Sequence, residues 1–281
     1  MIIWLASYPK SGNTLLRSIL SAYFFSKDGN FDFEQLKNIK TFPRIGFFKD
    51  LGIDTNNENE IFKNYINAQK NINFGNERKI IFLKTHSSYC KINNFPFTDS
   101  ENTLGAIYVV RDPRNIVNSL SNHFSNSISD ATNNLLGEMY QIEEGTKCRT
   151  HIGKWNFHYN SWKNFPKKNF LFIKYEDLII NKKDILRKIL NFLEILTKSK
   201  FPIDNTKIQK VISTTEFNHM KKMENKKGFH EASINTTTGK VNNFFNLGPN
   251  NDWKKLLNTE LKEKIEKNYK KEMIELGYIK N

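Results

Sequence analysis

The sequence contains few cysteines and no long apolar run. The two cysteines among its 281 residues, Cys90 and Cys148, form no Cys-x-x-Cys pair and no cluster with histidine. We therefore expect neither a disulfide framework nor a metal site, and sparse cysteine is typical of the reducing cytoplasm. The apolar run from Met1 to Ala6 is too short for the core of a signal peptide. No other run approaches the roughly 20 residues of a membrane span. These features predict a soluble, cytoplasmic protein without a transmembrane segment.

Basic residues outnumber acidic ones. The 43 Lys and Arg residues against 29 Asp and Glu residues give a formal net charge of +14. This charge favours anionic partners such as nucleotides, sulfated or phosphorylated molecules, nucleic acid or a membrane surface. The lysines accompany abundant Asn, Ile and Phe, so A/T-rich codon usage is an alternative explanation of the excess. No arginine-rich tract is present, which argues against nucleic acid as a partner.

Four short apolar runs predict the buried strands of a parallel sheet, because strands covered on both faces need not alternate with polar residues. They are Ile2–Leu5, Ile80–Leu83, Ala106–Val110 and Phe170–Ile173. Helical patterns occupy residues 13–25, 113–124, 181–196 and 259–276. This alternation predicts an α/β fold, a single domain over residues 1–281 with a central, mostly parallel β-sheet flanked by helices.

Two segments do not follow this alternation. Residues 31–76 have weaker periodicity, and we interpret them as a helical or loop insertion. Residues 236–251 are rich in Asn, Gly and Thr and are expected to form a long surface loop. Loops of this length in compact domains often bind ligands or cover a site.

Polar and basic residues follow each predicted strand, in the segments SYPKSGNT, KTHSS, RDPRN and KYEDL. In open parallel sheets, ligands bind beyond the carboxyl ends of the strands. These segments bring six cationic or titratable side chains to that edge: Lys10, Lys84, His86, Arg111, Arg114 and Lys174. The sequence therefore predicts a basic rim that binds anions.

The segment SYPKSGNTLLRSIL, residues 7–20, predicts a phosphate-binding turn between a strand and a helix. A tight turn at Gly12 lets the backbone N–H groups from Ser11 to Thr14 point at an anion at the positive helix N-terminus. Lys10 adds a cation. The segment lacks the second glycine and the Gly-Lys-Ser/Thr ending of the loop that binds nucleoside triphosphates. A plain surface connection is the alternative interpretation.

Two further strand ends carry groups suited to proton transfer and anion binding. A neutral imidazole at His86 could remove a proton from a hydroxyl, and Lys84 could stabilise charge on a transferred group. Arg111 and Ser119 meet only if the chain folds back between strand and helix, which would form a second anion site. Two separated phosphate sites suit a nucleotide phosphorylated at both ends of its ribose. The alternatives are a structural histidine and an ion pair between Arg111 and a carboxylate such as Asp177.

Together, the segments from Ile3 to about Leu257 resemble the sulfotransferases that use 3′-phosphoadenosine 5′-phosphosulfate, of the cytosolic type and its bacterial relatives. The resemblance implies their P-loop-kinase-like fold. YPKSGNT resembles the loop for the 5′-phosphosulfate, which implies contacts from Lys10, Ser11, Gly12, Asn13 and Thr14. KTH resembles the segment of the catalytic base, which implies that His86 is the base and that Lys84 assists it. RDPRNIVNSLSNHF resembles the 3′-phosphate site, which implies contacts from Arg111 and Ser119.

Later segments extend the resemblance to the nucleoside. FLFIKYEDL implies that Tyr175 lies by the nucleotide, and TTEFNHMKK implies that Thr215 and Phe217 lie on its adenine side. FFNLGPNNDWKKLL resembles the family's C-terminal loop, with Gly248 in register.

The sequence also departs from the family pattern. Leu15 stands where many members have a tryptophan that stacks on adenine. Asn246 and Leu247 stand where an Arg-Lys pair often binds the 3′-phosphate, and Lys240 is a nearby candidate replacement. Asn251 replaces the glycine before Asp-Trp.

The resemblance implies metal-independent, in-line transfer of a sulfuryl group to a hydroxyl or amine of a small-molecule or glycan acceptor, leaving adenosine 3′,5′-bisphosphate. His86 would deprotonate the acceptor, Lys10 and Lys84 would stabilise charge, and Ser119 would hold Lys10 off the bridging oxygen until the acceptor binds. The acceptor pocket is expected from residues 31–76, residues 125–149 and the loop before Gly248. The segment from residue 125 is expected to be either a lid or a solvated helix pair.

Three other functions remain open at this point. A P-loop nucleotide kinase would need a magnesium-binding acid, for which Asp112 is the one candidate. A catalytically inactive nucleotide-binding relative would keep the fold without the reaction. A protein that binds polyanions through its net charge would lose affinity steeply with salt and would tolerate loss of Lys10 or Arg111.

Overall fold

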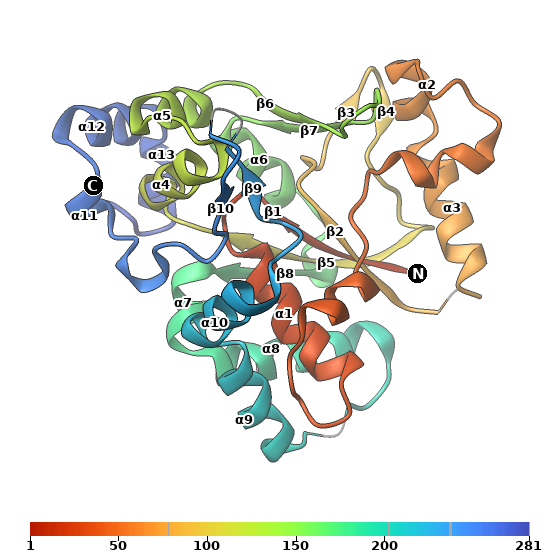
Figure 1. Ribbon diagram of the computed structural model, residues 1–281. Coiled ribbons are helices and arrows are strands. Elements are labelled where there is room, and N and C mark those ends of the chain that lie inside the picture. Colours follow the sequence, from red (N-terminus) through yellow and green to blue (C-terminus); the bar gives the residue numbers. More distant parts are fainter. Residues whose placement is uncertain (78, 202, 236–237, 281) are drawn as a thin grey trace.

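A four-stranded parallel sheet forms the centre of the protein, seen here in a computed structural model that describes residues 1–77, 79–201, 203–235 and 238–280 (Figure 1). The strands are β1 (Ile2–Ser7), β2 (Ile81–Thr85), β5 (Thr103–Val110) and β8 (Phe170–Lys174). They lie in the order β2-β1-β5-β8, and each pair of neighbours is parallel. The predicted α/β fold with a central parallel sheet is confirmed.

The side chains of β1 show why an uninterrupted apolar run forms this strand. Successive side chains of a strand point to opposite faces of the sheet. Accordingly, Ile2, Trp4 and Ala6 join one core cluster, and Ile3 and Leu5 join the other. All five are fully buried.

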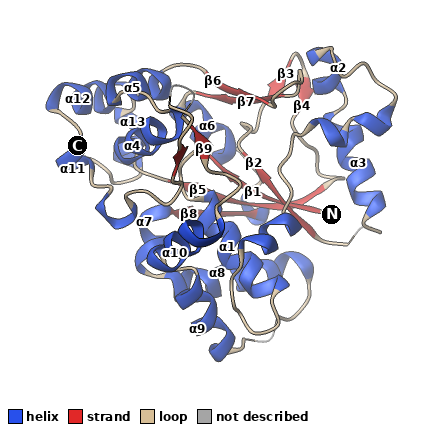
Figure 2. Ribbon diagram, in the orientation of Figure 1, coloured by secondary structure: helices blue, strands red, loops and turns tan. Residues whose placement is uncertain are grey.

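Helices cover both faces of the sheet, as Figure 2 shows. One face carries α1 (Asn13–Phe25), α7 (Tyr175–Ile180), α8 (Lys182–Thr197), α9 (Asn205–Thr214) and α10 (Phe217–Lys227). The opposite face carries α2 (Glu58–Lys63), α3 (Tyr65–Gly75), α4 (Pro113–Phe124), α5 (Ile128–Leu136), α6 (Trp155–Lys163), α12 (Thr259–Asn268) and α13 (Lys270–Glu275). The helix predicted over residues 259–276 is therefore two helices, because the backbone at Tyr269 leaves the helical region with φ −119° and ψ 19°.

In the described parts of the chain, three pairs of short antiparallel strands lie outside the central sheet. They are β3 (Lys91–Ile92) with β4 (Phe95–Pro96), β6 (Met139–Ile142) with β7 (Arg149–Gly153), and β9 (Ser233–Ile234) with β10 (Val241–Asn242). The segment 125–149 is thus one helix followed by a hairpin strand, and a solvated helix pair is the wrong description. Between residues 31 and 76, three 3₁₀ turns, at residues 33–38, 45–47 and 49–51, precede α2 and α3.

The predicted loop at residues 236–251 is only partly a surface loop. Thr236 and Thr237 lie outside the described residues, and β10 follows them. Phe245 is buried, and the backbone N–H groups of Phe244 and Phe245 donate hydrogen bonds to the carboxylate of Glu224. A 3₁₀ turn at Gly248–Asn250 and the short helix α11 (Trp253–Leu256) follow. Because Phe245 is buried, this segment packs on the core before the turn begins.

The order of the strands places a crevice at the carboxyl end of β1. β1 and β5 are neighbours in the middle of the sheet. The chain continues from β1 to β2 at one edge of the sheet, and from β5 to β8 at the opposite edge. Ligands of open parallel sheets bind where neighbouring strands have connections in opposite directions.

Candidate functional site

A cavity of about 1110 Å³ opens at this crevice. Its walls include most of the predicted site residues: Lys10, Gly12, Asn13, Thr14, Lys84, His86, Arg111, Ser119, Tyr175, Thr215, Phe217 and Gly248. Ser11 does not line the cavity: it is fully buried, although its neighbours in sequence, Lys10 and Gly12, are part of the wall. Tertiary structure thus brings together groups that are more than 200 positions apart along the chain. The strand-end rule predicted Lys10, Lys84, His86 and Arg111 at this edge, and the family resemblance implied the later residues.

The turn after β1 has the shape of an anion-binding loop. Gly12 is the N-cap of α1 and has φ +102°, a conformation that glycine adopts without steric cost. A Cβ built on Gly12 would lie 2.3 Å from Cδ2 of Tyr175, so the ring packs directly on the glycine backbone. The side-chain amide of Asn13 donates a hydrogen bond from Nδ2 to the carbonyl of Leu5 at 2.9 Å, which fixes the turn to β1. Within the described residues, the buried hydroxyl of Ser11 has no hydrogen-bond partner.

Lys10 is held in an unusual conformation beside this turn. Its φ is +64°, and its carbonyl accepts a hydrogen bond from Nη1 of Arg111 at 2.9 Å. Its ammonium lies 4.0 Å from the ring centroid of Phe244, within cation–π distance. Burial lowers the pKa of Lys10 to about 8, with Lys84 and Arg111 adding to the effect and Glu231 opposing it.

The imidazole of His86 is neutral and has one ring nitrogen, Nε2, that can accept a proton. Its Nδ1 lies 2.7 Å from the carbonyl oxygen of Ser7, which can only accept, so Nδ1 carries the proton and Nε2 is the basic nitrogen. Burial and then the charge of Lys84 hold the pKa of His86 well below its usual value, which keeps the imidazole neutral. His158 fixes the backbone, because its Nε2 lies 3.1 Å from the carbonyl oxygen of His86 while its Nδ1 lies 2.9 Å from the hydroxyl of Tyr108.

Arg111 and Ser119 do meet, as the folded-back turn requires. Nη1 of Arg111 lies 3.4 Å from the hydroxyl oxygen of Ser119, and the guanidinium stacks 4.3 Å from the ring centroid of Tyr175. Among the described residues, Arg111 forms no ion pair, and its buried Nε has no hydrogen-bond partner. An ion pair with Asp177 is thus the wrong interpretation. The side chain of Asn251 also donates to Ser119, at 3.1 Å, so the hydroxyl proton of Ser119 remains available for an anion.

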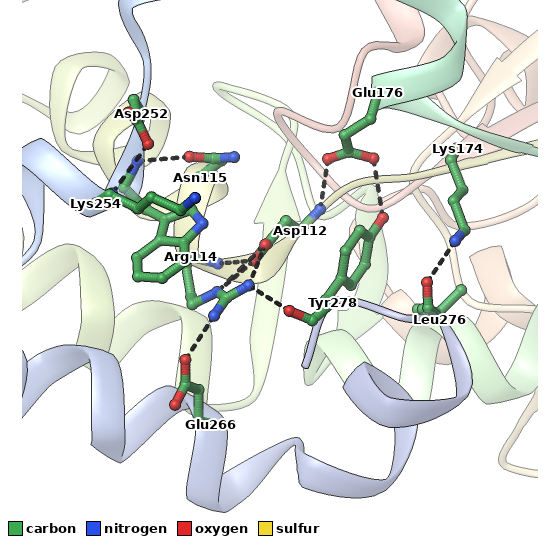
Figure 3. Close-up of polar contacts among 11 residues, drawn as sticks. Asp112, Arg114, Asn115, Lys174, Glu176, Asp252, Lys254, Glu266, Leu276 and Tyr278 are labelled. Atoms are coloured by element: carbon green, nitrogen blue, oxygen red, sulfur yellow. Dashed lines mark hydrogen bonds and ion pairs between the residues drawn. The ribbon is translucent and has the colours of Figure 1, made fainter. Parts of the chain in front are cut away.

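Two members of the predicted basic rim do not belong to the cavity. Arg114 pairs with Asp112 at 2.6 Å and with Glu266 at 2.5 Å, and it stacks 3.8 Å from the centroid of Trp253. Lys174 donates to the carbonyl of Leu276. Figure 3 shows Arg114 directed toward Asp112, Glu266 and Tyr278, and Lys174 directed separately toward Leu276. The expectation that Arg114 and Lys174 join the rim is wrong. Carboxylates bind Arg114 and the carbonyl of Leu276 binds Lys174, and neither cation lines the cavity.

Phe217 lies at the part of the cavity wall that the resemblance assigns to the adenine. A Cβ on Gly248, whose φ is +53°, would lie 2.5 Å from the Phe217 ring, so the glycine backbone packs against that ring. The hydroxyl of Thr215 donates to the carbonyl of Val211 at 2.7 Å. Leu15 lines the cavity in place of an aromatic residue. The lining also contains Asn246 and Leu247, whereas Lys240 is not part of it.

Glu231 also lines the cavity, although no pattern in the sequence predicts it there. Its carboxylate accepts hydrogen bonds from Thr14 at 2.8 Å and from Arg17 at 2.5 Å, and the ammonium of Lys84 lies 3.2 Å away. No motif around Glu231 could have indicated it, because its three partners lie far away along the chain.

The described residues contain no group of three or more His, Cys, Asp or Glu side chains that could hold a metal ion. Within the same residues, no helix combines the length and the apolar character needed to cross a bilayer.

Comparisons with known proteins agree with this geometry. The family pattern described as "Sulfotransferase domain" matches residues 2–277. Human sulfotransferase 1E1 is 26% identical over 279 residues, covering 96% of this chain and 83% of the relative. Amine sulfotransferase of Oryctolagus cuniculus is 24% identical over 280 residues, covering 96% of this chain and 80% of the relative.

Solved structures have the same fold. Mouse sulfotransferase SULT7A1, solved with PAP, has a TM-score of 0.61 at 20% identity, covering 97% of this chain and 84% of that one. Retinol dehydratase, solved with androsterone and the inactive cofactor PAP, has a TM-score of 0.60 at 17% identity, covering 97% and 80%. Because the family pattern spans nearly the whole sequence, this chain belongs to the sulfotransferase domain family.

Proposed function

We propose that this sulfotransferase uses 3′-phosphoadenosine 5′-phosphosulfate as donor and binds it across the β1–β5 crevice. The observation that carries this proposal is that the two predicted anion sites contain buried hydrogen-bond donors with no partner among the described residues. They are the hydroxyl of Ser11 in the turn after β1 and Nε of Arg111 after β5. Buried polar groups are nearly always hydrogen-bonded, so Nε of Arg111, which lines the cavity, is suited to an oxygen of a bound phosphate. Ser11 stands between Lys10 and Gly12, which line the cavity.

The two ends of the donor fit the two sites. The N–H groups of residues 12–14 at the start of α1, with Lys10, suit the 5′-phosphosulfate, whereas the N–H of Ser11 is donated to the carbonyl of Tyr8. The guanidinium of Arg111 and the free hydroxyl proton of Ser119 suit the 3′-phosphate. Phe217 and Tyr175 line the cavity with apolar ring surface for the nucleoside.

The residues around His86 support a direct transfer. When bound, the donor supplies a sulfuryl group whose bond to the bridging oxygen breaks as the acceptor oxygen or nitrogen bonds to sulfur. Nε2 of His86 takes the acceptor proton, since its Nδ1 proton is committed to Ser7. Lys10 and Lys84 line the same cavity and stabilise charge as cations. We retain Ser119 as the residue that restrains Lys10 before the acceptor binds.

The acceptor is a small molecule or glycan with a hydroxyl or amine, and nucleic acid is not among the partners we propose. The relatives support a small molecule, since one is named an amine sulfotransferase and another a 3-beta-hydroxysteroid sulfotransferase. Side chains of Phe47, Phe124, Met139 and Tyr140 add apolar surface to the lining of the cavity. Both cysteines are free, which supports a cytoplasmic location.

A magnesium-dependent kinase is disfavoured by the state of Asp112. Its carboxylate accepts hydrogen bonds from the backbone N–H of Arg114 at 2.9 Å and from the Arg114 guanidinium. The residue thus caps α4 and balances a buried cation, as the position before Pro113 predicts. An inactive relative is disfavoured because the proton-accepting geometry of His86 is intact.

Sulfate transfer from the labelled donor to a panel of hydroxyl and amine compounds tests the function. Replacing His86→Ala is expected to abolish transfer while calorimetry shows nearly unchanged affinity for adenosine 3′,5′-bisphosphate. His219→Ala, at an exposed position on α10, is the matched control and keeps full activity. Full activity of His86→Ala would exclude it as the base. Tight binding of magnesium–ATP without binding of adenosine 3′,5′-bisphosphate would favour the kinase.

A further inference from the structure

Glu231 places a negative charge in a cavity built for anions. It lies in the connection between α10 and β9, and its side chain is 17% exposed. Oε1 lies 2.5 Å from Nη1 of Arg17 and 3.2 Å from Nζ of Lys84, and Oε2 accepts the hydroxyl proton of Thr14 at 2.8 Å. Of these partners, Thr14 belongs to the turn that the proposed function assigns to the 5′ end of the donor, and Lys84 is one of the two cations that it assigns to charge stabilisation during transfer.

The Thr14 hydroxyl cannot serve Glu231 and a phosphate at once. A hydroxyl has one proton to donate, and here it is donated to Oε2 of Glu231. The ammonium of Lys84 is likewise bound by this carboxylate, so its charge is balanced inside the protein. The Thr14 hydroxyl becomes available to an exogenous anion only when Glu231 releases it, and the charge of Lys84 is then no longer balanced inside the protein.

The carboxylate is charged under all ordinary conditions. Burial alone would raise the pKa of Glu231, but the charges of Lys84 and Arg17 and the hydrogen bonds from Arg17 and Thr14 outweigh burial and hold the pKa well below its usual value. Like charges in a partly desolvated cavity repel strongly. A donor phosphate and the Glu231 carboxylate are therefore competitors for the same cations.

The surroundings allow the side chain to leave without unfolding its segment. The neighbouring Phe229 is buried and packs on Phe33 and Phe245, with ring centroids 4.4 Å and 5.4 Å away. This anchor holds the backbone of the connection. Glu231 itself lines the open cavity, so rotation of its side chain toward solvent is sufficient to free Thr14 and Lys84.

We propose that Glu231 is a specificity-determining residue of the donor site, an internal anion that occupies Thr14, Arg17 and Lys84 and is exchanged for the 5′-anionic group of the donor. The inference rests on the proposed function. A nucleotide without a 5′-phosphate cannot make this exchange and gains nothing from Thr14 or Lys84. Glu231 thereby selects ligands that are charged at the 5′ end. The apparent affinity for such ligands is reduced by the fraction of molecules in which the carboxylate still occupies the site.

Calorimetry on the intact protein tests this competition. The isosteric variant Glu231→Gln is expected to bind adenosine 3′,5′-bisphosphate about tenfold more tightly than the wild type, which corresponds to about 1.4 kcal/mol. Adenosine 3′-monophosphate, which lacks the 5′-phosphate, is expected to bind both proteins within about twofold. This second ligand separates exchange at the 5′ end from a general change in cavity charge.

Glu216→Gln is the matched control, because Glu216 lines the same cavity but pairs with Lys182 at 2.7 Å instead of with the turn after β1. It is expected to leave the affinity for adenosine 3′,5′-bisphosphate within about twofold. If Glu231→Gln does not fold, Glu231→Asp keeps the charge and shortens the reach to Thr14. It is then expected to shift the affinity in the same direction by a smaller factor.

Equal or weaker binding of adenosine 3′,5′-bisphosphate by the Glu231 variant overturns the inference and makes Glu231 an organiser of the site. An equal gain for both nucleotides also overturns it. In either case the wild type still binds adenosine 3′,5′-bisphosphate, and the proposed donor stands. If the wild type binds neither nucleotide, the proposed donor and this inference fail together.

Discussion

Replacing Gly12 with alanine tests whether the turn after β1 depends on close contact with Tyr175. Gly12 has φ +102°, and a Cβ there would lie 2.3 Å from Cδ2 and 2.9 Å from Cε2 of the Tyr175 ring. Real Cβ atoms do not approach other heavy atoms so closely, so the ring must move. Tyr175 also stacks on Arg111 at 4.3 Å, and a displaced ring would disturb the second anion site.

The expected loss has two parts. An L-residue at this φ costs about 1 to 3 kcal/mol of backbone strain. Overpacking that shifts a ring in a well-packed wall costs typically about 1 to 3 kcal/mol more. Gly12→Ala should therefore lower the free energy of unfolding by roughly 2 to 6 kcal/mol, a large share of the roughly 5 to 15 kcal/mol that holds a domain folded.

Urea unfolding at equilibrium measures this loss. Gly75→Ala is the control, because Gly75 ends α3, is exposed, and a Cβ there meets nothing within 4 Å. It is expected to leave stability unchanged or to raise it by about 0.5 to 1 kcal/mol. In the double variant Gly12→Ala/Tyr175→Ala the ring is absent, so the two changes should cost less than the sum of the single variants by about 1 to 3 kcal/mol. A Gly12→Ala protein as stable as the wild type, or strictly additive changes, would refute the steric argument.

Two further predictions concern charge. The affinity for adenosine 3′,5′-bisphosphate should fall as pH rises through about 8, because burial lowers the pKa of Lys10 to about 8 and the ammonium loses its proton there. Calorimetry between about pH 7 and 10 checks this, and an affinity independent of pH would contradict the role of Lys10. Arg114→Met should lower the free energy of unfolding by about 3 to 5 kcal/mol, because it leaves the buried Asp112 unpaired. The same variant should keep the nucleotide affinity of the wild type, and a large loss of affinity would place Arg114 in the cavity after all.

Local patterns in the sequence determined the elements that frame the site. The helices predicted over residues 13–25 and 113–124 have those bounds in the structure. Their starts are set by neighbouring residues, a glycine at φ +102° before one and an Asp-Pro pair before the other. Continuous apolar runs identified the four central strands, because helices cover both faces of the sheet that these strands form. Such signals act within a few residues and are therefore visible in a single sequence.

The grouping of the site residues was also predictable, because the carboxyl ends of parallel strands share one edge of the sheet. That rule placed Lys10, Lys84, His86 and Arg111 around one cavity. It gave no means of telling which cations face the cavity. Arg114 stands three positions after Arg111, yet it binds Glu266 of a helix from the other end of the chain.

Only the tertiary structure decided the charge balance of the cavity. Thr14 and Glu231 are 217 positions apart, and no periodicity or motif links them. Their contact depends on how the connection after α10 packs over the turn after β1, through buried rings such as Phe229. The sequence alone thus determined an anion-binding sulfotransferase fold, because strands, turns and helix starts depend on neighbours in the chain. Which anion occupies the site in the absence of a ligand depends on distant side chains, and only folding brings those together.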